Sequence, residues 1–175
     1  MTQPDTNARH PTELVAKLAH VLHAEHFPSG DRAALKRMAI KGRTPLAYHR
    51  FLLAQVPEAF HKPKWNIAWR TLICGLAMQH GQPHNSSRPL GRALANIDFS
   101  ESRLEQLLAA DEDVLATLVL RAARRLASRR SSANWNDFAR LLFASSDAER
   151  ERINTRIAQD FYRTSGQLEA EPAAT

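Results

Sequence analysis

The chain has 175 residues, 43% of them hydrophobic and 24% charged, so it is long enough to bury a core of its own. Its 24 lysines and arginines exceed its 18 acidic residues and give a formal charge of +6, which predicts attraction to polyanions. One cysteine excludes an internal disulfide, and the sequence has neither a signal-peptide core nor a membrane-spanning run, so we expect a soluble, cytoplasmic protein that does not bind membranes.

The first half of the chain has the apolar spacing of four helices. Pro11 is well placed to begin the first helix, and Gly42 follows the second as a stop signal. Thr44 and Pro45 have the residue types of an N-cap and a first-turn proline for the third helix. The expected helices of this half are about 11–25, 31–40, 45–53 and 64–79.

The second half has the pattern of five further helices, after a polar connector rich in turn-forming residues. Ser100 and Asn134 are placed as N-caps, and Asp111 begins a long helix. Ser146 and Glu149 form the pattern of a capping box, in which each side chain accepts from the backbone amide of the other residue. The expected helices of this half are about 90–96, 101–109, 111–128, 135–144 and 147–164.

These patterns predict an all-α protein with about nine helices, because strand-like alternation is nowhere sustained. The connector at 81–87 divides the chain into two small helical-bundle subdomains, 11–80 and 88–164. The polar ends, 1–10 and 165–175, are expected to be flexible tails.

Several aromatic side chains and the single cysteine are expected in the core. Trp135 and Phe138 lie three residues apart on a capped helix, which is the spacing of a buried stripe. Trp65 and Trp69 have a similar spacing, so packing accounts for these aromatic residues better than base stacking does. Cys74 lies in an apolar run and is expected to pack as a small hydrophobic residue.

The residues that could carry catalysis or bind a metal do not form a recognisable site. His20 and His23 can share a helix face, but their spacing differs from that of the zinc motif His-Glu-x-x-His, and no second ligand cluster accompanies them. Asp111, Glu112 and Asp113 lie at a predicted helix start, where carboxylates favour the helix dipole. No nucleophile elbow or phosphate-binding glycine loop is present. We therefore expect a non-enzymatic protein without a metal or another cofactor.

Arginines gather on one side of the long helix expected to follow Asp111. Arg121, Arg124, Arg125 and Arg129 fall within roughly 140° of arc, beside the apolar face of that helix. The helix dipole favours cations only near the last turn, so it does not account for Arg121. The planar fork of arginine matches the geometry of phosphate oxygens, which favours a role in phosphate binding.

A second basic stripe lies on the second expected helix. Arg32 and Lys36 share a face there, and Arg37 is adjacent. Two basic stripes on different helices suit a groove for a phosphate backbone better than a single base-reading helix. The alternative is a helical adaptor that docks on acidic protein surfaces without direct contact to nucleic acid.

Particular runs of residues give more specific information than the composition does. They are Leu90-Gly91-Arg92-Ala93-Leu94-Ala95-Asn96, Glu101-Ser102-Arg103-Leu104, Arg124-Arg125-Leu126, Asn134-Trp135 and Asp160-Phe161-Tyr162. Together these runs resemble the CasB family, the small subunits of type I-E CRISPR Cascade complexes. In the first half, the segment from Arg32 to Arg37 looks like the basic second helix of that family, and the segment from Tyr48 to Leu52 looks like its aromatic-Arg-Leu segment. The resemblance covers roughly 30–163.

The resemblance implies a non-catalytic, two-part helical protein that is present as two copies in the complex. Its partners would be the backbone and large Cascade subunits, the guide RNA, the target DNA and the displaced single strand. Its role would be to stabilise the opened DNA through backbone contacts, while base pairing with the guide supplies sequence recognition.

The basic stripes and the family-like segments together give eight candidate phosphate-binding residues. They are Lys36, Arg37, Arg50, Arg92, Arg103, Arg121, Arg124 and Arg125. Two of them have structural alternatives, because Arg103 has an acidic neighbour with which it could pair and Arg92 could bridge two helices. The helix that carries Arg121, Arg124 and Arg125 is the main candidate.

Overall fold

The computed structural model describes residues 8–169, without the side chains of Asp113 and 167–169. Short 3₁₀ helices (η) accompany nine α-helices in this part of the chain. In chain order the elements are η1 (Pro11–Leu14), α1 (Val15–His23), α2 (Ser29–Lys36), α3 (Leu46–Gln55), η2 (Glu58–Phe60), η3 (Pro63–Trp65), α4 (Asn66–Ala77), α5 (Leu90–Ala95), α6 (Glu101–Ala109), α7 (Glu112–Ser128), α8 (Trp135–Phe143) and α9 (Asp147–Glu169). The described residues contain no strand, only an isolated bridge between His84 and Ala133, so the all-α prediction is confirmed.

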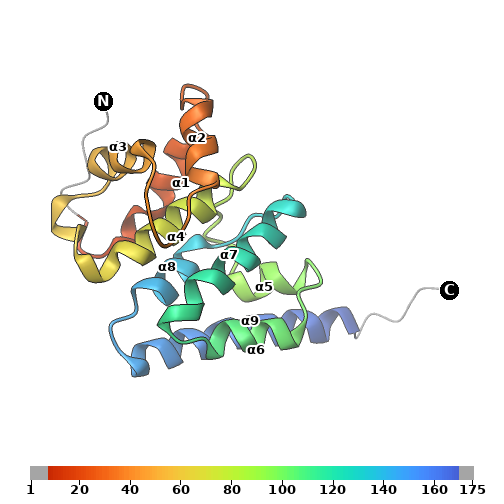
Figure 1. Cartoon of the computed structure of the whole chain (residues 1–175). Helices are drawn as coiled ribbons and strands as arrows, with labels where there is room; N and C mark the ends of the chain where they lie inside the picture. Colours follow the sequence, from red (N-terminus) through yellow and green to blue (C-terminus); the bar gives the residue numbers. More distant parts are fainter. Residues whose placement is uncertain (1–7, 170–175) are drawn as a thin grey trace.

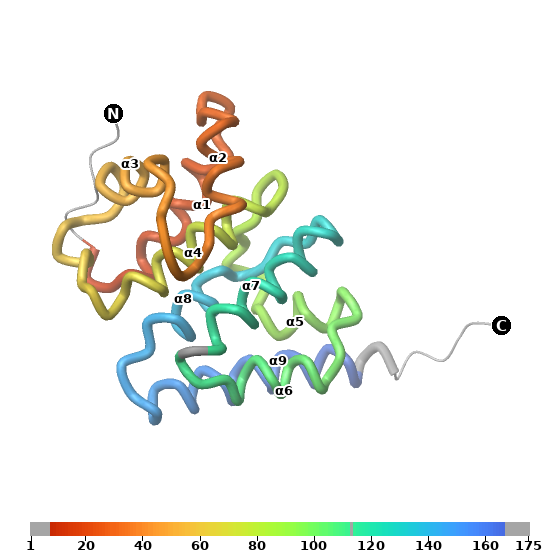
Figure 2. The backbone as a smooth tube through the Cα atoms, viewed as in Figure 1, coloured from red at the N-terminus to blue at the C-terminus, as the bar shows by residue number. Residues whose placement is uncertain are grey.

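The helices form two groups that are joined through α7 and α8 (Figure 1). Helices α1 to α4 gather at one end of the molecule, and α5, α6 and α9 lie at the other. Helix α4 packs against α1, α2, α7 and α8, whereas α5 packs mainly against α9. The backbone trace shows α7 passing between the two groups (Figure 2). This arrangement places α7 beside α6 on one side and near the segment after α2 on the other.

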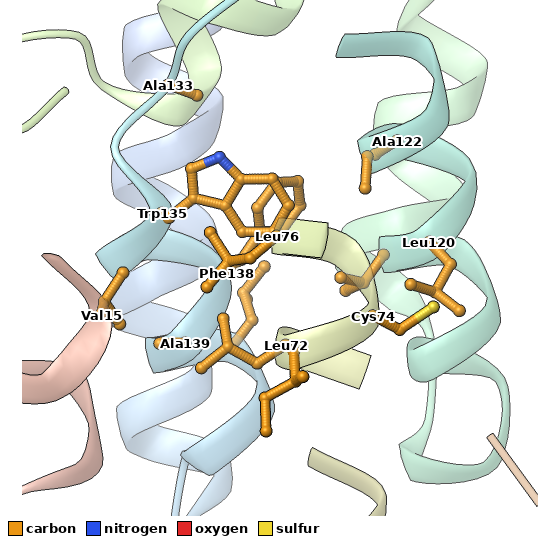
Figure 3. Packing of buried hydrophobic residues seen from close by; sticks show 14 of the residues in the cluster. Val15, Leu72, Cys74, Leu76, Leu120, Ala122, Ala133, Trp135, Phe138 and Ala139 are labelled. Carbon is orange, nitrogen blue, oxygen red and sulfur yellow. The ribbon is translucent and has the colours of Figure 1, made fainter. Parts of the chain in front are cut away.

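The core is built around α4 and α8. From Thr71 to Gln79 every residue is buried, which is why the sequence there is almost entirely apolar. Trp135 and Phe138 are fully buried, and their rings are in tilted contact with centroids 5.0 Å apart, which confirms their prediction as core residues (Figure 3). Cys74 is 1% exposed, and burial raises the pKa of its thiol to about 11, so it packs as a neutral hydrophobic group.

The connector between the two halves is tied to the loop before α8. The backbone amide of Asn85 donates to the carbonyl of Ala133 at 2.9 Å, and the amide of Ala133 donates to the carbonyl of Pro83 at 3.0 Å. A single cluster of buried residues extends through both halves of the chain. The division into subdomains 11–80 and 88–164 stays a prediction. The continuous core and the loop contact join these two parts of the chain.

The N-caps predicted at Ser100 and Asn134 are present, and Asp111 is a further N-cap. The side chains of Ser100, Asp111 and Asn134 accept hydrogen bonds from the first-turn amides of α6, α7 and α8. The prediction for Thr44 is wrong: Pro45 occupies the N-cap of α3, and Thr44 bonds the ring of His49 instead. Proline cannot offer a capping side chain, so α3 begins without one.

The start and end of α9 differ from expectation. Ser146 accepts from the amide of Glu149 as predicted, but the Glu149 carboxylate accepts from the amide and hydroxyl of Ser145 rather than from Ser146. The helix continues to Glu169 instead of ending near Thr164, so 165–169 are helical rather than part of a tail. At the other end, His10 caps η1, and 1–7 and 170–175 lie outside the described residues.

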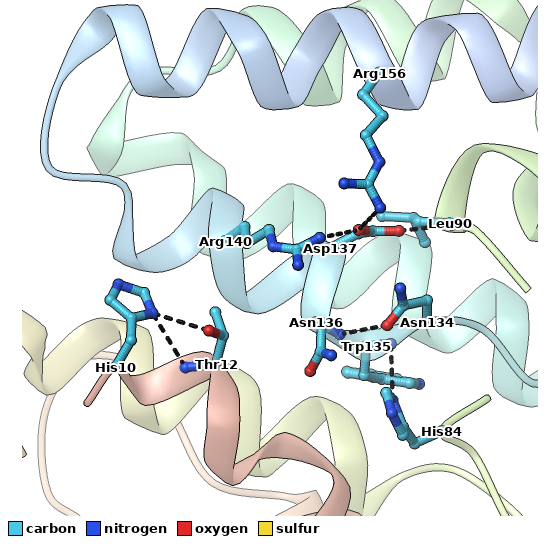
Figure 4. A network of polar contacts seen from close by, with 10 residues as sticks. All are labelled: His10, Thr12, His84, Leu90, Asn134, Trp135, Asn136, Asp137, Arg140 and Arg156. Atoms are coloured by element: carbon cyan, nitrogen blue, oxygen red, sulfur yellow. Dashed lines mark hydrogen bonds and ion pairs between the residues drawn. The ribbon is translucent and has the colours of Figure 1, made fainter. Parts of the chain in front are cut away.

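A buried carboxylate fixes the short helix α5 between α8 and α9 (Figure 4). Asp137 on α8 is 3% exposed and accepts from the amide of Leu90, the first residue of α5, at 3.0 Å. Arg140 and Arg156 reach the other carboxylate oxygen at 3.2 Å and 3.7 Å. A buried charge is stable only when it is paired and hydrogen-bonded, and this network meets that requirement while tying the first residue of α5 to α8.

Two partly buried histidines make stability sensitive to mild acid. Burial lowers the pKa of His84, whose Nδ1 accepts from the amide of Trp135, and burial also lowers the pKa of His23, whose Nε2 donates to the carbonyl of Leu76. In the unfolded chain both imidazoles titrate near pH 6.5. The unfolded state therefore binds more protons below that pH, and stability is complete above pH 6.5 and is lost as the pH falls.

We expect the free energy of unfolding to fall as the pH drops below 6.5, because the unfolded chain binds protons that the two native imidazoles resist. Urea unfolding at pH 7.5, 6.5 and 5.5 measures this loss above the range in which most carboxylates titrate. A His23→Gln/His84→Gln variant should have a flatter profile. A profile with the same slope as the wild type would assign the loss to other groups.

Candidate nucleic-acid interface

A pocket between α6 and α7 brings together four of the predicted arginines. Its volume is about 420 Å³. Arg103 comes from α6, and Arg121, Arg124 and Arg125 come from α7. The complete lining is Phe99, Arg103, Gln106, Leu107, Leu118, Arg121, Arg124, Arg125 and Ser128.

The periodicity of the two helices explains why these side chains meet. On α7, Val119, Ala122 and Leu126 are completely buried, so the intervening arginines must lie toward the surface. Arg121 and Arg124 are exposed, and Arg125 is half-buried at the edge of the core. On α6 the Ser100 cap fixes the first turn, and Leu104 and Leu107 fill the core side. Arg103 is therefore left on the side that faces α7.

The four arginines of this pocket are not neutralised by any side chain that the structure describes. None of them forms an ion pair with a carboxylate in the described part of the chain. The buried Nε of Arg125 also has no hydrogen-bond acceptor there. Arg103, which could have paired with a neighbouring acid, makes no such pair among the described side chains. Like charges held close together repel one another, so the pocket favours an anion that offsets this repulsion.

A second hollow extends this basic surface toward the N-terminal helices. It has a volume of about 550 Å³ and is lined by Arg37, Lys41 and Arg124 together with apolar side chains. Arg124 lines both hollows, so the charged surface is continuous from α6 across α7 to the segment after α2. We call the two hollows together the arginine surface.

Arg70, which sequence reasoning did not single out, holds that segment in place. Its Nη1 donates to the carbonyls of Ile40 and Gly42, at 3.0 Å each. The only signal in the sequence was a single arginine inside the apolar helix that became α4. The role of Arg70 is to support the chain that carries Arg37 and Lys41, since its guanidinium bonds protein carbonyls.

The remaining predicted basic residues lie away from the pocket between α6 and α7. Lys36 is exposed at the end of α2, next to Arg37 in sequence but outside the lining of either hollow. Arg50 on α3 pairs with Asp31 at 2.8 Å, and Arg92 is exposed on α5. Arg32 on α2 has a structural role.

Arg32 binds the end of α1. Its Nε donates to the carbonyl of Leu22 at 2.8 Å, and its guanidinium also contacts the ring of Phe27. Carbonyls in the last turn of a helix lack intrahelical partners, and this arginine supplies one. The stripe that Arg32 was expected to form with Lys36 is therefore not a continuous phosphate-binding face.

The opposite side of α6 carries the reverse charge. A groove of about 840 Å³ between α6 and α9 is lined by Glu101, Glu105 and Glu151, with Arg163 as the one basic residue among its lining side chains. The hydroxyl of Tyr162 donates to Glu101 across this groove. We call it the acidic groove, and its charge opposes contact with nucleic acid.

The described residues contain no group of three or more His, Cys, Asp or Glu side chains that could hold a metal ion. No helix within 8–169 is long and apolar enough to cross a membrane. The arginine surface gathers five of the eight predicted phosphate-binding residues, namely Arg37, Arg103, Arg121, Arg124 and Arg125.

The family model for the CRISPR-associated protein Cse2 matches residues 31–162, which is most of the chain. The chain belongs to the Cse2 family. The match contains both basic hollows, and it confirms the resemblance to CasB proteins, the other name of this family. Cse2 membership supports a role as the small, structural subunit of a Cascade complex with other subunits.

A solved structure with the Cse2 fold is also similar. The crystal structure of CasB from Thermus thermophilus aligns with a TM-score of 0.68 and 23% sequence identity, over 88% of this chain and 99% of that chain. At this identity the likeness shows a shared fold. No curated protein matches the sequence.

Proposed function

We propose that this Cse2-family chain binds the sugar-phosphate backbone of nucleic acid, independently of sequence, and thereby stabilises the R-loop during DNA recognition by Cascade. The observation that carries the proposal is the pocket in which Arg103, Arg121, Arg124 and Arg125 meet without a described carboxylate partner. Arginines that are not committed to internal ion pairs remain available for phosphate oxygens.

The energetics of strand exchange explain why such contacts are sufficient. A guide–target heteroduplex is about as stable as the DNA duplex that it replaces, so modest backbone contacts can favour the open state. Those contacts need no base reading, because pairing with the guide RNA supplies the sequence specificity. The role is non-catalytic, and the partners are the backbone and large Cascade subunits, the guide RNA, the target strand and the displaced strand.

The rest of the basic residues extend the proposed surface. Arg37 continues it through the second hollow, with Lys36 next to it in sequence. Arg50 and Arg92 would contribute at the margins, where two copies of the chain arranged in one complex give a longer basic path. Arg50 would first have to exchange its partner, Asp31, for a phosphate.

Replacing Arg121, Arg124 and Arg125 together with alanine should weaken binding to every DNA sequence alike. Each lost phosphate contact removes about 0.7 from the slope of log K against log salt for a single strand, so we expect the slope to fall by about two. Fluorescence anisotropy on two unrelated single-stranded sequences at several salt concentrations measures both effects. In an assembled complex the same variant should impair R-loop stability more than guide loading.

A matched control removes the same formal charge from elsewhere. Lys62, Arg152 and Arg163 are exposed and lie outside the arginine surface, so their replacement with alanine should change the slope far less. If the variant of Arg121, Arg124 and Arg125 is folded and keeps the wild-type slope, the phosphate-binding proposal is wrong. That outcome would favour the helical adaptor that docks on acidic protein surfaces.

A further inference from the structure

The pocket between α6 and α7 has an apolar wall that phosphate binding does not require. Phe99, Leu107 and Leu118 line it together with the four arginines. A surface that contacts only phosphates needs charge and hydrogen-bond donors, and apolar lining adds nothing to that contact. Pockets that bind small organic ligands combine apolar walls with a few polar groups, and they occupy about 300–1,000 Å³, a range that includes this one.

We propose that this pocket takes one unpaired nucleotide, with its base against Leu118 and the small exposed edge of Phe99, above the buried Leu107, and with its phosphate on the arginines. The inference rests on the proposed function and deepens it, because it adds a base to a site otherwise assigned to phosphates. Bases are recognised in this way by stacking on aromatic rings and guanidinium planes, and such stacking tolerates any sequence.

Two neutral side chains in the lining fit the edge of a base. Gln106 is exposed and offers both a donor and an acceptor. The hydroxyl of Ser128 donates to the carbonyl of Arg125 at 2.8 Å, and its oxygen remains able to accept. An amide and a hydroxyl bond weakly to phosphate beside four guanidinium groups, so their chemistry is of more use to a base.

Arg125 belongs both to the phosphate-binding arginines and to the wall against which the base is proposed to lie. It is half-buried, and its Nε lacks an acceptor among the described residues. An unpaired buried donor is costly, and a ligand oxygen that a small guanidinium rotation brings within reach relieves that cost. A base in a duplex is stacked and paired and cannot enter the pocket without extrusion, so the site selects single strands.

The test compares strands of equal charge with and without bases. A fluorescent single-stranded DNA of mixed sequence competes with an abasic strand that has the same number of phosphates, and an RNA strand is compared with its abasic form in a parallel series. We expect the base-containing strand to bind at least about fivefold more tightly in one or both series, since stacking of a single base accounts for that factor or more. The series with the preference identifies the sugar.

Two variants of identical chemistry locate the effect. Ser128→Leu adds apolar volume inside the pocket without changing charge, and it should abolish the preference for bases while the abasic strand still binds. Ser102→Leu makes the same change on the exposed side of α6 outside the pocket, and it should keep the preference. A preference that survives Ser128→Leu would overturn the assignment of the base to this pocket.

A second readout identifies the contact directly. Photocrosslinking of a strand that contains 5-iodouracil should label the peptide with Phe99, and labelling confined to other peptides would contradict the proposal.

Failure of the nucleotide site and failure of the phosphate-binding function give different results. If the arginine variant loses affinity but base-containing and abasic strands bind equally, only the nucleotide site is wrong; if the arginine variant loses none, the phosphate-binding function fails as well.

Discussion

Replacing Gly91 with alanine should destabilise the protein by about 3 kcal/mol or more, because α5 and α9 touch through their backbones at this residue. A Cβ atom at Gly91 would lie 2.1 Å from the carbonyl oxygen of Ile157 and 2.7 Å from the amide nitrogen of Phe161. Neither neighbour is the tip of a flexible side chain, so a whole helix has to move. Chemical denaturation followed by circular dichroism measures the loss.

Gly166→Ala is the matched control for Gly91→Ala. Gly166 lies on α9, and a Cβ there would meet nothing within 4 Å. Alanine is the better helix former, so this change should be neutral or should stabilise the protein by up to about 1 kcal/mol. If Gly91→Ala were equally harmless, the close packing of α5 on α9 would not exist in solution.

Trp135→Ala should cost about 3–5 kcal/mol of stability, the range for removing a fully buried tryptophan. The side chain is 0% exposed and lies between Phe138 and α4, so its loss leaves a cavity that the helices cannot close. Trp135→Phe keeps most of the volume and removes an indole N–H that has no acceptor among the described residues. It should cost far less, and equal costs for the two variants would contradict the cavity explanation.

Gly75 on α4 provides a sharper control, because it contacts the same indole ring. A Cβ at Gly75 would lie 2.9 Å from Cζ3 of Trp135, so Gly75→Ala alone should destabilise the protein. In the Trp135→Ala background the added methyl group enters the new cavity, and the same change should become neutral or stabilising. A double-mutant cycle measures this coupling, and additive effects would mean that the two side chains are not in contact.

Local sequence signals predicted most of the helix starts. Ser100 and Asn134 cap helices as expected, since an N-cap depends on a side chain and amides only two or three residues away. The burial of Trp135 and Phe138 also followed from spacing alone. Helix class and core stripe are decided by short-range periodicity, which a single sequence displays.

Features that depend on distant partners could not be predicted in the same way. The carbonyls of Ile40 and Gly42, for example, accept from Arg70, about thirty residues further along the chain. The contact of Gly91 with Ile157 joins residues on helices far apart in sequence. A glycine in a helix looks like a weak position until the neighbouring backbone is known.

The candidate site was partly accessible from the sequence. The arc of Arg121, Arg124 and Arg125 follows from the helical repeat, and the structure brings it together with Arg103. The sequence did not indicate that Arg50 pairs with Asp31, because helix-to-helix distances decide that contact. The acidic groove was also missed, since its glutamates come from two helices that only the fold places side by side.

Helix α6 is the common wall of the pocket that holds Arg103 and of the acidic groove that holds Glu101 and Glu105. Charges of opposite sign on its two sides give the molecule an electric asymmetry across a single helix. In the field of a polyanion this asymmetry produces a torque, which turns the arginine side toward the strand before contact is made. The fraction of collisions that arrive in a productive orientation therefore rises at low ionic strength and declines as salt shortens the screening length.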